Sequence, residues 1–158
     1  METASLSVIK KELKLLPPET LLEHCLRLTK YKKENKELLS YLLFEAGNEQ
    51  EFVRQAKEEV DQQFENLNRS SLYLAKKTLR KVLRTINKYI KFSTHKTTEI
   101  ELLIYFCKKL RKSGLAISRS KILRNMYQRQ VERINKVLSM LHEDLQYDYQ
   151  DEVETLIN

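Results

Sequence analysis

Adjacent histidine and cysteine residues at positions 24 and 25 are side chains of the kind that nucleophilic catalysis uses. A catalytic thiol needs a base within hydrogen-bonding reach. Neighbouring residues of a helix point about 100° apart, so His24 and Cys25 cannot meet face to face there. We therefore interpret Cys25 and Cys107 as buried core thiols and His24 as a surface residue.

The three histidines, His24, His95 and His142, do not have the spacing of a metal site. None follows a carboxylate by three residues, and none has a second histidine four residues away. Glycine occurs only at positions 47 and 114, which leaves no room for a glycine-rich phosphate-binding loop. We expect no metal, no cofactor and no P-loop.

Two acidic pairs, Glu58 with Glu59 and Glu99 with Glu101, are the remaining candidates for acid–base chemistry. Such work needs a cleft that brings one carboxylate beside another helix. Most acidic pairs on helices simply face water, and the pattern selects none of these four as catalytic. We predict that the protein is not an enzyme, with a site assembled from distant residues as the alternative.

The amino-acid composition limits the possible fold classes. The chain has 158 residues, of which 41% are hydrophobic and 32% charged, and glycine and proline number only two each. So few turn formers exclude an all-β protein, and the length suits one all-helical domain over residues 1–158. The longest apolar runs, 41–44 and 102–107, are too short to cross a bilayer, and the N-terminus has no secretory pattern. We predict a soluble cytoplasmic protein without a membrane partner.

Turn and capping residues divide the chain into about seven helices. Pro17 ends one helix, and Pro18 suits the first position of the next. Gly47 stops a third helix, after which Asn48 and Glu51 form a capping pair for a fourth. The predicted helices span 6–16, 18–31, 37–46, 49–67, 71–92, 97–114 and 118–157, the last as one helix or a kinked pair.

The apolar patterns assign positions to these helices. The helices at 37–46 and 97–114 are apolar on most sides and are expected in the centre, with Leu103 and Cys107 nearly inaccessible. The helix at 49–67 has a narrow apolar stripe and is expected outside. Short polar links favour antiparallel hairpins, in which the second helix pairs with the third, the fourth with the fifth and the sixth with the seventh.

The spacing Leu-x-x-x-Cys-x-x-Leu occurs at both 21–28 and 103–110, although no period of 34 or 40 residues persists. In helix order and length over residues 18–142, the sequence resembles the HEAT and armadillo class of α-α superhelices. That resemblance implies stacked hairpins, as a superhelix or an irregular bundle, that offer a concave face to a macromolecular partner.

Charge is distributed unevenly along the chain. Residues 69–136 hold 19 basic and 3 acidic residues, whereas residues 1–68 hold 10 and 13, and residues 137–158 hold none and 6. A basic segment of this kind suggests a polyanionic partner, although a charged stripe is also the ordinary solvent face of a helix. The candidate polyanion-binding residues are Lys77, Lys81, Arg84, Lys88, Lys91, Lys108, Lys109, Arg111, Lys112, Arg119, Lys121 and Arg124.

A glycine turn between basic helices carries a second resemblance. Residues 108–124 are similar to a helix-turn-helix DNA reader, except that Leu115 and Ala116 lengthen the turn by about two residues. Our leading hypothesis is a non-enzymatic helical interaction module for a protein or polyanionic partner. The alternative is a nucleic-acid-binding protein that uses the helices at 71–92 and 97–136, and homo-oligomerisation stays open.

The C-terminal segment 143–154 is acidic, with six carboxylates and no basic residue. Leu145, Tyr149, Val153 and Leu156 nevertheless keep a helical apolar stripe, which a disordered tail would not need. We predict that this segment is a docked helix. It either completes the core or masks the basic half from a polyanion.

Overall fold

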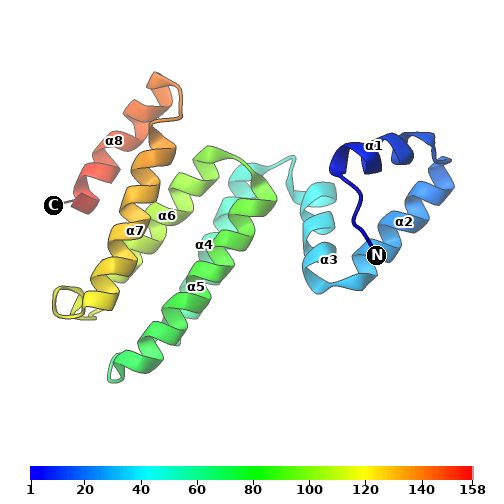
Figure 1. Cartoon of the computed structure of the whole chain (residues 1–158). Helices are drawn as coiled ribbons and strands as arrows, with labels where there is room; N and C mark the ends of the chain where they lie inside the picture. The colour runs from blue at the N-terminus through cyan, green and yellow to red at the C-terminus, as the bar shows by residue number, and fades with distance from the viewer. Residues whose placement is uncertain (158) are drawn as a thin grey trace. The chain divides into compact units, whose positions relative to one another are not determined.

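The computed structural model describes residues 1–157, and this part of the chain contains helices and no strand (Figure 1). The predicted all-α class is confirmed, with eight α-helices rather than about seven. The helices form two compact units: unit 1 is Met1–Phe44, and unit 2 begins at Glu45. The prediction of one domain over residues 1–158 stays a prediction.

Unit 1 consists of three short helices: α1 (Leu6–Leu15), α2 (Pro18–Tyr31) and α3 (Lys33–Ser40). The Ser5 hydroxyl caps α1 by accepting a hydrogen bond from the Val8 backbone N–H at 3.4 Å. Pro18 begins α2, as predicted. The Asn35 side chain donates to the Leu28 carbonyl at 2.7 Å and so fixes the turn between α2 and α3. A π-helical turn, Tyr41–Glu45, then leads into unit 2.

Two expectations for unit 1 are wrong. The helix predicted at 37–46 begins at Lys33 and is α-helical only to Ser40, and Leu42, Leu43 and Phe44 are exposed rather than central. Cys25 is exposed, not buried. Both errors have one cause: an apolar pattern predicts burial only where other helices surround it, and three short helices surround very little.

Unit 2 contains five longer helices. They are α4 (Glu49–Glu65), α5 (Leu72–Ser93), α6 (Lys96–Arg111), α7 (Lys121–Leu138) and α8 (Glu143–Ile157), with a 3-10 turn at Ile117–Arg119. The segment predicted at 118–157 as one helix or a kinked pair is therefore two helices. The acidic segment is helical and docked, as predicted, with Val153 and Leu156 buried and α8 packed on α6 and α7.

The core of unit 2 is built around α6. Leu103, Cys107 and Phe106 are 0% exposed, which confirms the central position predicted for this helix. The apolar stripe of α4 is buried as well, from Val53 to Leu67. The expected partners α4 with α5 and α6 with α7 contact one another.

The five helices form two layers, with α5 and α7 in front of the paler α4 and α6 in Figure 1. The helices α4, α6 and α8 begin at Glu49, Lys96 and Glu143, so each start follows the last by 47 residues. Several side-chain contacts between these helices share an offset in sequence. Lys57 with Glu101, Tyr105 with Asp61 and Lys108 with Glu152 each join residues 44 apart, whereas Lys109 with Asp61 and Tyr149 with Glu101 join residues 48 apart. The second layer consists of α5 and α7.

Candidate functional site

The helix α5 is strongly amphipathic. Ser71 caps it by accepting a hydrogen bond from the Leu74 N–H at 3.3 Å, and it ends at Thr94, whose φ is 59°. Ala75, Leu79 and Val82 lie inward with no exposed surface. The helix holds seven Lys and Arg and no acidic residue. Its outer side is consequently basic from Lys77 to Lys91.

Four of the five predicted site residues on α5, Lys77, Lys81, Arg84 and Lys91, are exposed and form no ion pair with any residue that the structure describes. The fifth, Lys88, is half-buried, and its Nζ lies 5.0 Å from the centre of the Tyr89 ring. The prediction omitted Arg80, which is exposed one residue before Lys81. With 3.6 residues per turn, Arg80 lies on the same broad side of the helix as the predicted residues.

The helix α7 also has exposed basic residues. Arg133 is half-buried and donates to Glu99 Oε1 at 2.6 Å and to Asn87 Oδ1 at 2.5 Å, which holds α7 beside α5 and α6. Arg129 and Lys136 lie near Arg133 in helical phase and are exposed. We call the exposed residues Lys77, Arg80, Lys81, Arg84 and Lys91 of α5, with Arg129 and Lys136 of α7, the basic face.

Three predicted site residues on α6 do not join the basic face. Lys108 pairs with Glu152 of α8 at 2.6 Å, and Lys109 pairs with Asp61 of α4 at 2.8 Å. Arg111 donates to the carbonyl of Thr155. Their charge serves contacts within the layer of α4, α6 and α8, and the structure separates them from the α5 residues with which they were grouped.

The other predicted residues lie at the end of unit 2 that holds the loop between α6 and α7. Lys112, Arg119 and Lys121 are exposed there. Arg119 lines a groove of about 340 Å³ with Arg69, a residue that the sequence did not single out. Arg69 donates to the Ser113 carbonyl at 2.7 Å and so joins the two loops.

Arg124 lies apart from this groove. It lines a separate hollow beside Leu156 of α8 and donates to the Ser118 carbonyl at 3.1 Å. Nine residues separate α6 from α7, and the two helices form a hairpin. A helix-turn-helix reader has a turn of three to four residues and a steep crossing, so its geometry is not formed.

Charge divides between the two layers of unit 2. The helices α5 and α7 together hold twelve basic residues and one acidic residue, Glu132. The helices α4, α6 and α8 hold six basic and fourteen acidic residues. Of the sixteen surplus positive charges in residues 69–136, eleven thus lie on α5 and α7.

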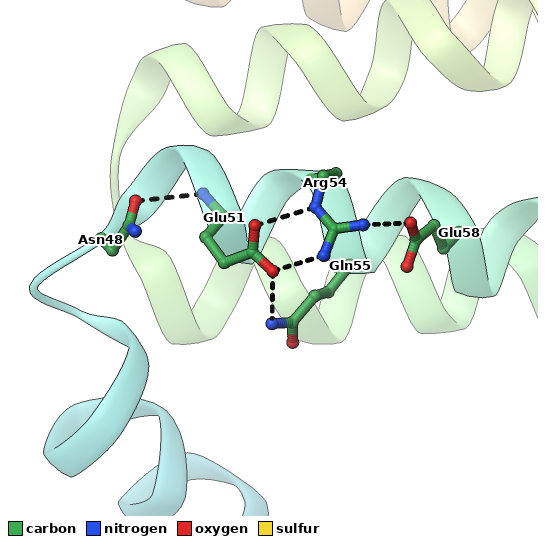
Figure 2. Close-up of polar contacts among 5 residues, drawn as sticks. All are labelled: Asn48, Glu51, Arg54, Gln55 and Glu58. Carbon is green, nitrogen blue, oxygen red and sulfur yellow. Dashed lines mark hydrogen bonds and ion pairs between the residues drawn. The ribbon is translucent and has the colours of Figure 1, made fainter.

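Four of the six cations of the acidic layer, Arg54, Lys57, Lys108 and Lys109, are paired with carboxylates. Figure 2 shows Arg54 of α4 between Glu51 and Glu58, to both of which it donates hydrogen bonds. Hydrogen bonds from Arg54 and Gln55 lower the pKa of Glu51 to about 2. Asn48 caps the same helix by accepting from the Glu51 N–H at 3.2 Å, while the Glu51 carboxylate turns to Arg54 instead of closing the capping box.

The two acidic pairs considered for acid–base chemistry are held in structural contacts. Glu58 binds Arg54, and Glu59 accepts from Tyr89 and from Gln63. Glu99 binds Arg133, and Glu101 accepts from Lys57 and from Tyr149. Each carboxylate therefore links helical turns or joins two helices.

The cysteines differ in their surroundings. Burial raises the pKa of the Cys107 thiol to about 12, so the thiol stays protonated at neutral pH. Cys25 and His24 are both exposed on α2. Over residues 1–157, His, Cys, Asp and Glu side chains do not gather in any group of three that would hold a metal ion. Every helix in the same range is too short or too polar to span a bilayer.

Comparison with known proteins adds no relative. No protein-family model, no curated protein sequence and no solved structure matches this chain.

Proposed function

We propose that this protein is a non-enzymatic helical binding module whose basic face binds a polyanionic macromolecule, with nucleic acid as the polyanion. The observation that carries the proposal is the division of charge between the layers of unit 2. An ordinary solvent-facing helix mixes both signs, whereas α5 has seven cations and no acid. Such a surface attracts polyanions over several ångströms and raises their association rate.

Cations of the basic face have no carboxylate partner among the described residues, which supports the proposal that they bind a ligand from outside the chain. Lys57, Lys108, Lys109 and Arg133 each have a carboxylate partner within unit 2. Lys77, Lys81 and Arg84 have none among the described residues, although unit 2 has many acidic residues on its other layer. Side chains left in this condition are available to phosphates, which Lys and Arg contact in most protein–nucleic acid complexes.

The layered arrangement also supports a finer architectural proposal. The 47-residue recurrence of α4, α6 and α8 matches the roughly 40 to 47 residues of a HEAT or armadillo repeat. We propose that unit 2 is a short α-α superhelix of that kind, in which α5 and α7 form the binding layer. A cytoplasmic location stays a prediction.

The proposal is tested by fluorescence anisotropy with labelled duplex DNA over a series of salt concentrations. Each neutralised phosphate contributes roughly −0.9 to the slope of log K against log salt. The triple variant Lys77→Ala, Lys81→Ala, Arg84→Ala should flatten that slope by as much as about 2.7 without changing the circular dichroism spectrum.

A matched control removes the same charge elsewhere. Lys10, Lys11 and Lys14 lie on α1 and are exposed. Their replacement by Ala should leave the salt slope close to that of the wild type. Salt-independent binding, or equal effects of the two triple variants, would overturn the proposal.

A further inference from the structure

The groove beside Arg69 and Arg119 joins two loops at one end of unit 2. The linker between α4 and α5 and the loop between α6 and α7 form its walls, and its volume is about 340 Å³. Leu72, Leu115 and Leu123 line it, and the two arginines are the charged residues among the lining residues. The chain enters unit 2 at the start of α4, and the groove lies beyond the far end of this helix, which is roughly 25 Å long. The groove is therefore a feature of unit 2 alone.

The two arginines of the groove have no carboxylate partner among the described residues. Arg69 donates from Nε to the Ser113 carbonyl at 2.7 Å, which holds its guanidinium in place while the two terminal nitrogens stay available to other acceptors. Arg119 is exposed at the end of the 3-10 turn. Both loops belong to the segments 66–98 and 102–131, which contain no Asp or Glu. The groove consequently suits an anion.

A row of residues on α5 connects this groove with the basic face. Lys76, Arg80 and Arg84 follow Leu72 at successive intervals of four residues. Each interval advances the row by about 6 Å and turns it by only about 40° around the helix. Arg80 and Arg84 belong to the basic face, and the half-buried Lys76 lies between them and the groove. A strand whose phosphates follow this row would reach the groove at its end.

Two arginines around a small groove favour a terminal phosphate over an internal one. A phosphate monoester has three terminal oxygens and a charge of about −1.5 to −2 at pH 7. Guanidinium groups bind such oxygens through paired, charge-assisted hydrogen bonds. An internal phosphodiester has only two terminal oxygens and a single charge, so it offers less to two arginines. The leucines of the groove suit the sugar and base of the last nucleotide.

We propose that the groove binds a phosphate monoester at the end of a nucleic-acid strand, whose following phosphates lie along the basic face. Arg69 and Arg119 bind the terminal phosphate. This inference rests on the function proposed for the basic face and adds to it a preference for phosphorylated strand ends.

The test compares two internally labelled duplexes of one DNA sequence, with either phosphate or hydroxyl groups at the strand ends. Fluorescence anisotropy at one salt concentration should show that the wild type binds the phosphorylated duplex at least about tenfold more tightly, because hydrogen bonds to charged groups are strong. Arg119→Gln should reduce this preference to within about twofold. The matched control is Arg124→Gln. It removes one exposed arginine at the same end of unit 2 but outside the groove, and it should keep the preference.

Competition with a nucleoside 5′-monophosphate distinguishes a strand end from a free small molecule. The monophosphate should displace the phosphorylated duplex only at concentrations at least about a hundredfold above those of unlabelled phosphorylated duplex, because it makes no contact with the basic face. Displacement by both competitors at similar concentrations would assign the groove to a free ligand and overturn the inference. Equal affinity of the wild type for the two duplexes, or an equal loss of preference in both variants, would overturn this inference alone. Absence of binding to either duplex would overturn the function of the basic face as well.

Discussion

The two units of this chain are built from the same kind of amphipathic helix, yet they bury their apolar side chains to very different degrees. Among the described residues, 24 buried apolar side chains lie in unit 2, whereas Tyr41 alone is buried in unit 1. Unit 2 buries many apolar side chains because α6 lies between α4 and α8 and packs against α5 and α7. Unit 1 has no helix with neighbours on several sides. The amphipathic patterns therefore predict the helices of both units correctly, but they predict the buried core correctly only in unit 2.

The units differ equally in the surfaces that they offer. Unit 2 buries most of its large apolar side chains and presents exposed cations on α5 that have no carboxylate partner. Unit 1 has nearly balanced charge and presents aliphatic side chains. The surface of unit 2 suits a charged ligand whose binding depends on salt.

The largest expected effect comes from removal of α8. Truncation after Met140 deletes Val153 and Leu156 from the core and removes the hydrogen bond from the Tyr127 hydroxyl to the Leu156 carbonyl, 2.8 Å long. Loss of two buried side chains should lower the free energy of unfolding by about 3 to 6 kcal/mol, measured by urea denaturation. A truncated chain that keeps its stability and binds DNA more tightly would instead show that α8 masks the basic face.

A single core substitution should have the next largest effect. Leu103→Ala should cost about 2 to 5 kcal/mol, because Leu103 is 0% exposed in the centre of α6. Leu22→Ala on α2 is its counterpart in unit 1, where the side chain is 60% exposed. That change should cost less than about 0.5 kcal/mol. Similar losses of unfolding free energy at the two positions would contradict the difference in burial between the units.

Alkaline pH should weaken unit 2 by a smaller amount. Burial, together with the neighbouring carboxylates of Asp61 and Glu101, raises the pKa values of Tyr105 and Tyr149 to about 12. A folded pKa above the ordinary value of 10 means that the folded state holds the proton more tightly. The resulting stabilisation is present below pH 10 and is lost as the pH rises from 10 to 12.

The variant Tyr149→Phe isolates one of these groups. At neutral pH it should cost about 1 kcal/mol, the usual contribution of one hydrogen bond, because the Tyr149 hydroxyl donates to Glu101 Oε1 at 3.1 Å. It should also reduce the loss of stability between pH 10 and 12. Identical pH dependence in the variant and the wild type would show that this hydroxyl does not contribute.

The sequence predicts much of unit 2 and little of unit 1, for a physical reason. Leu103 and Cys107 belong to a helix that is apolar on most sides, and their burial follows wherever neighbouring helices exist. Cys25 has the same local spacing but is exposed, because burial depends on helices distant in sequence. Local periodicity does not reveal how many helices surround a given one.

The candidate site was predicted in part for the same reason. The outer side of α5 follows from a period of 3.6 and the absence of acidic residues. The partners of Lys108 and Lys109 are Glu152 and Asp61, each more than forty residues away, which no local pattern indicates. The 47-residue recurrence is equally hidden, because chemically different pairs, Asp61 with Tyr105 and Lys108 with Glu152, form contacts at positions 47 residues apart.

A salt series on the wild-type chain tests the central claim that the basic face of unit 2 binds a polyanion. The affinity for duplex DNA is measured between low and moderate salt. The account predicts that the affinity falls by about tenfold or more, as several phosphate contacts require. An affinity that stays unchanged over this range of salt would contradict it.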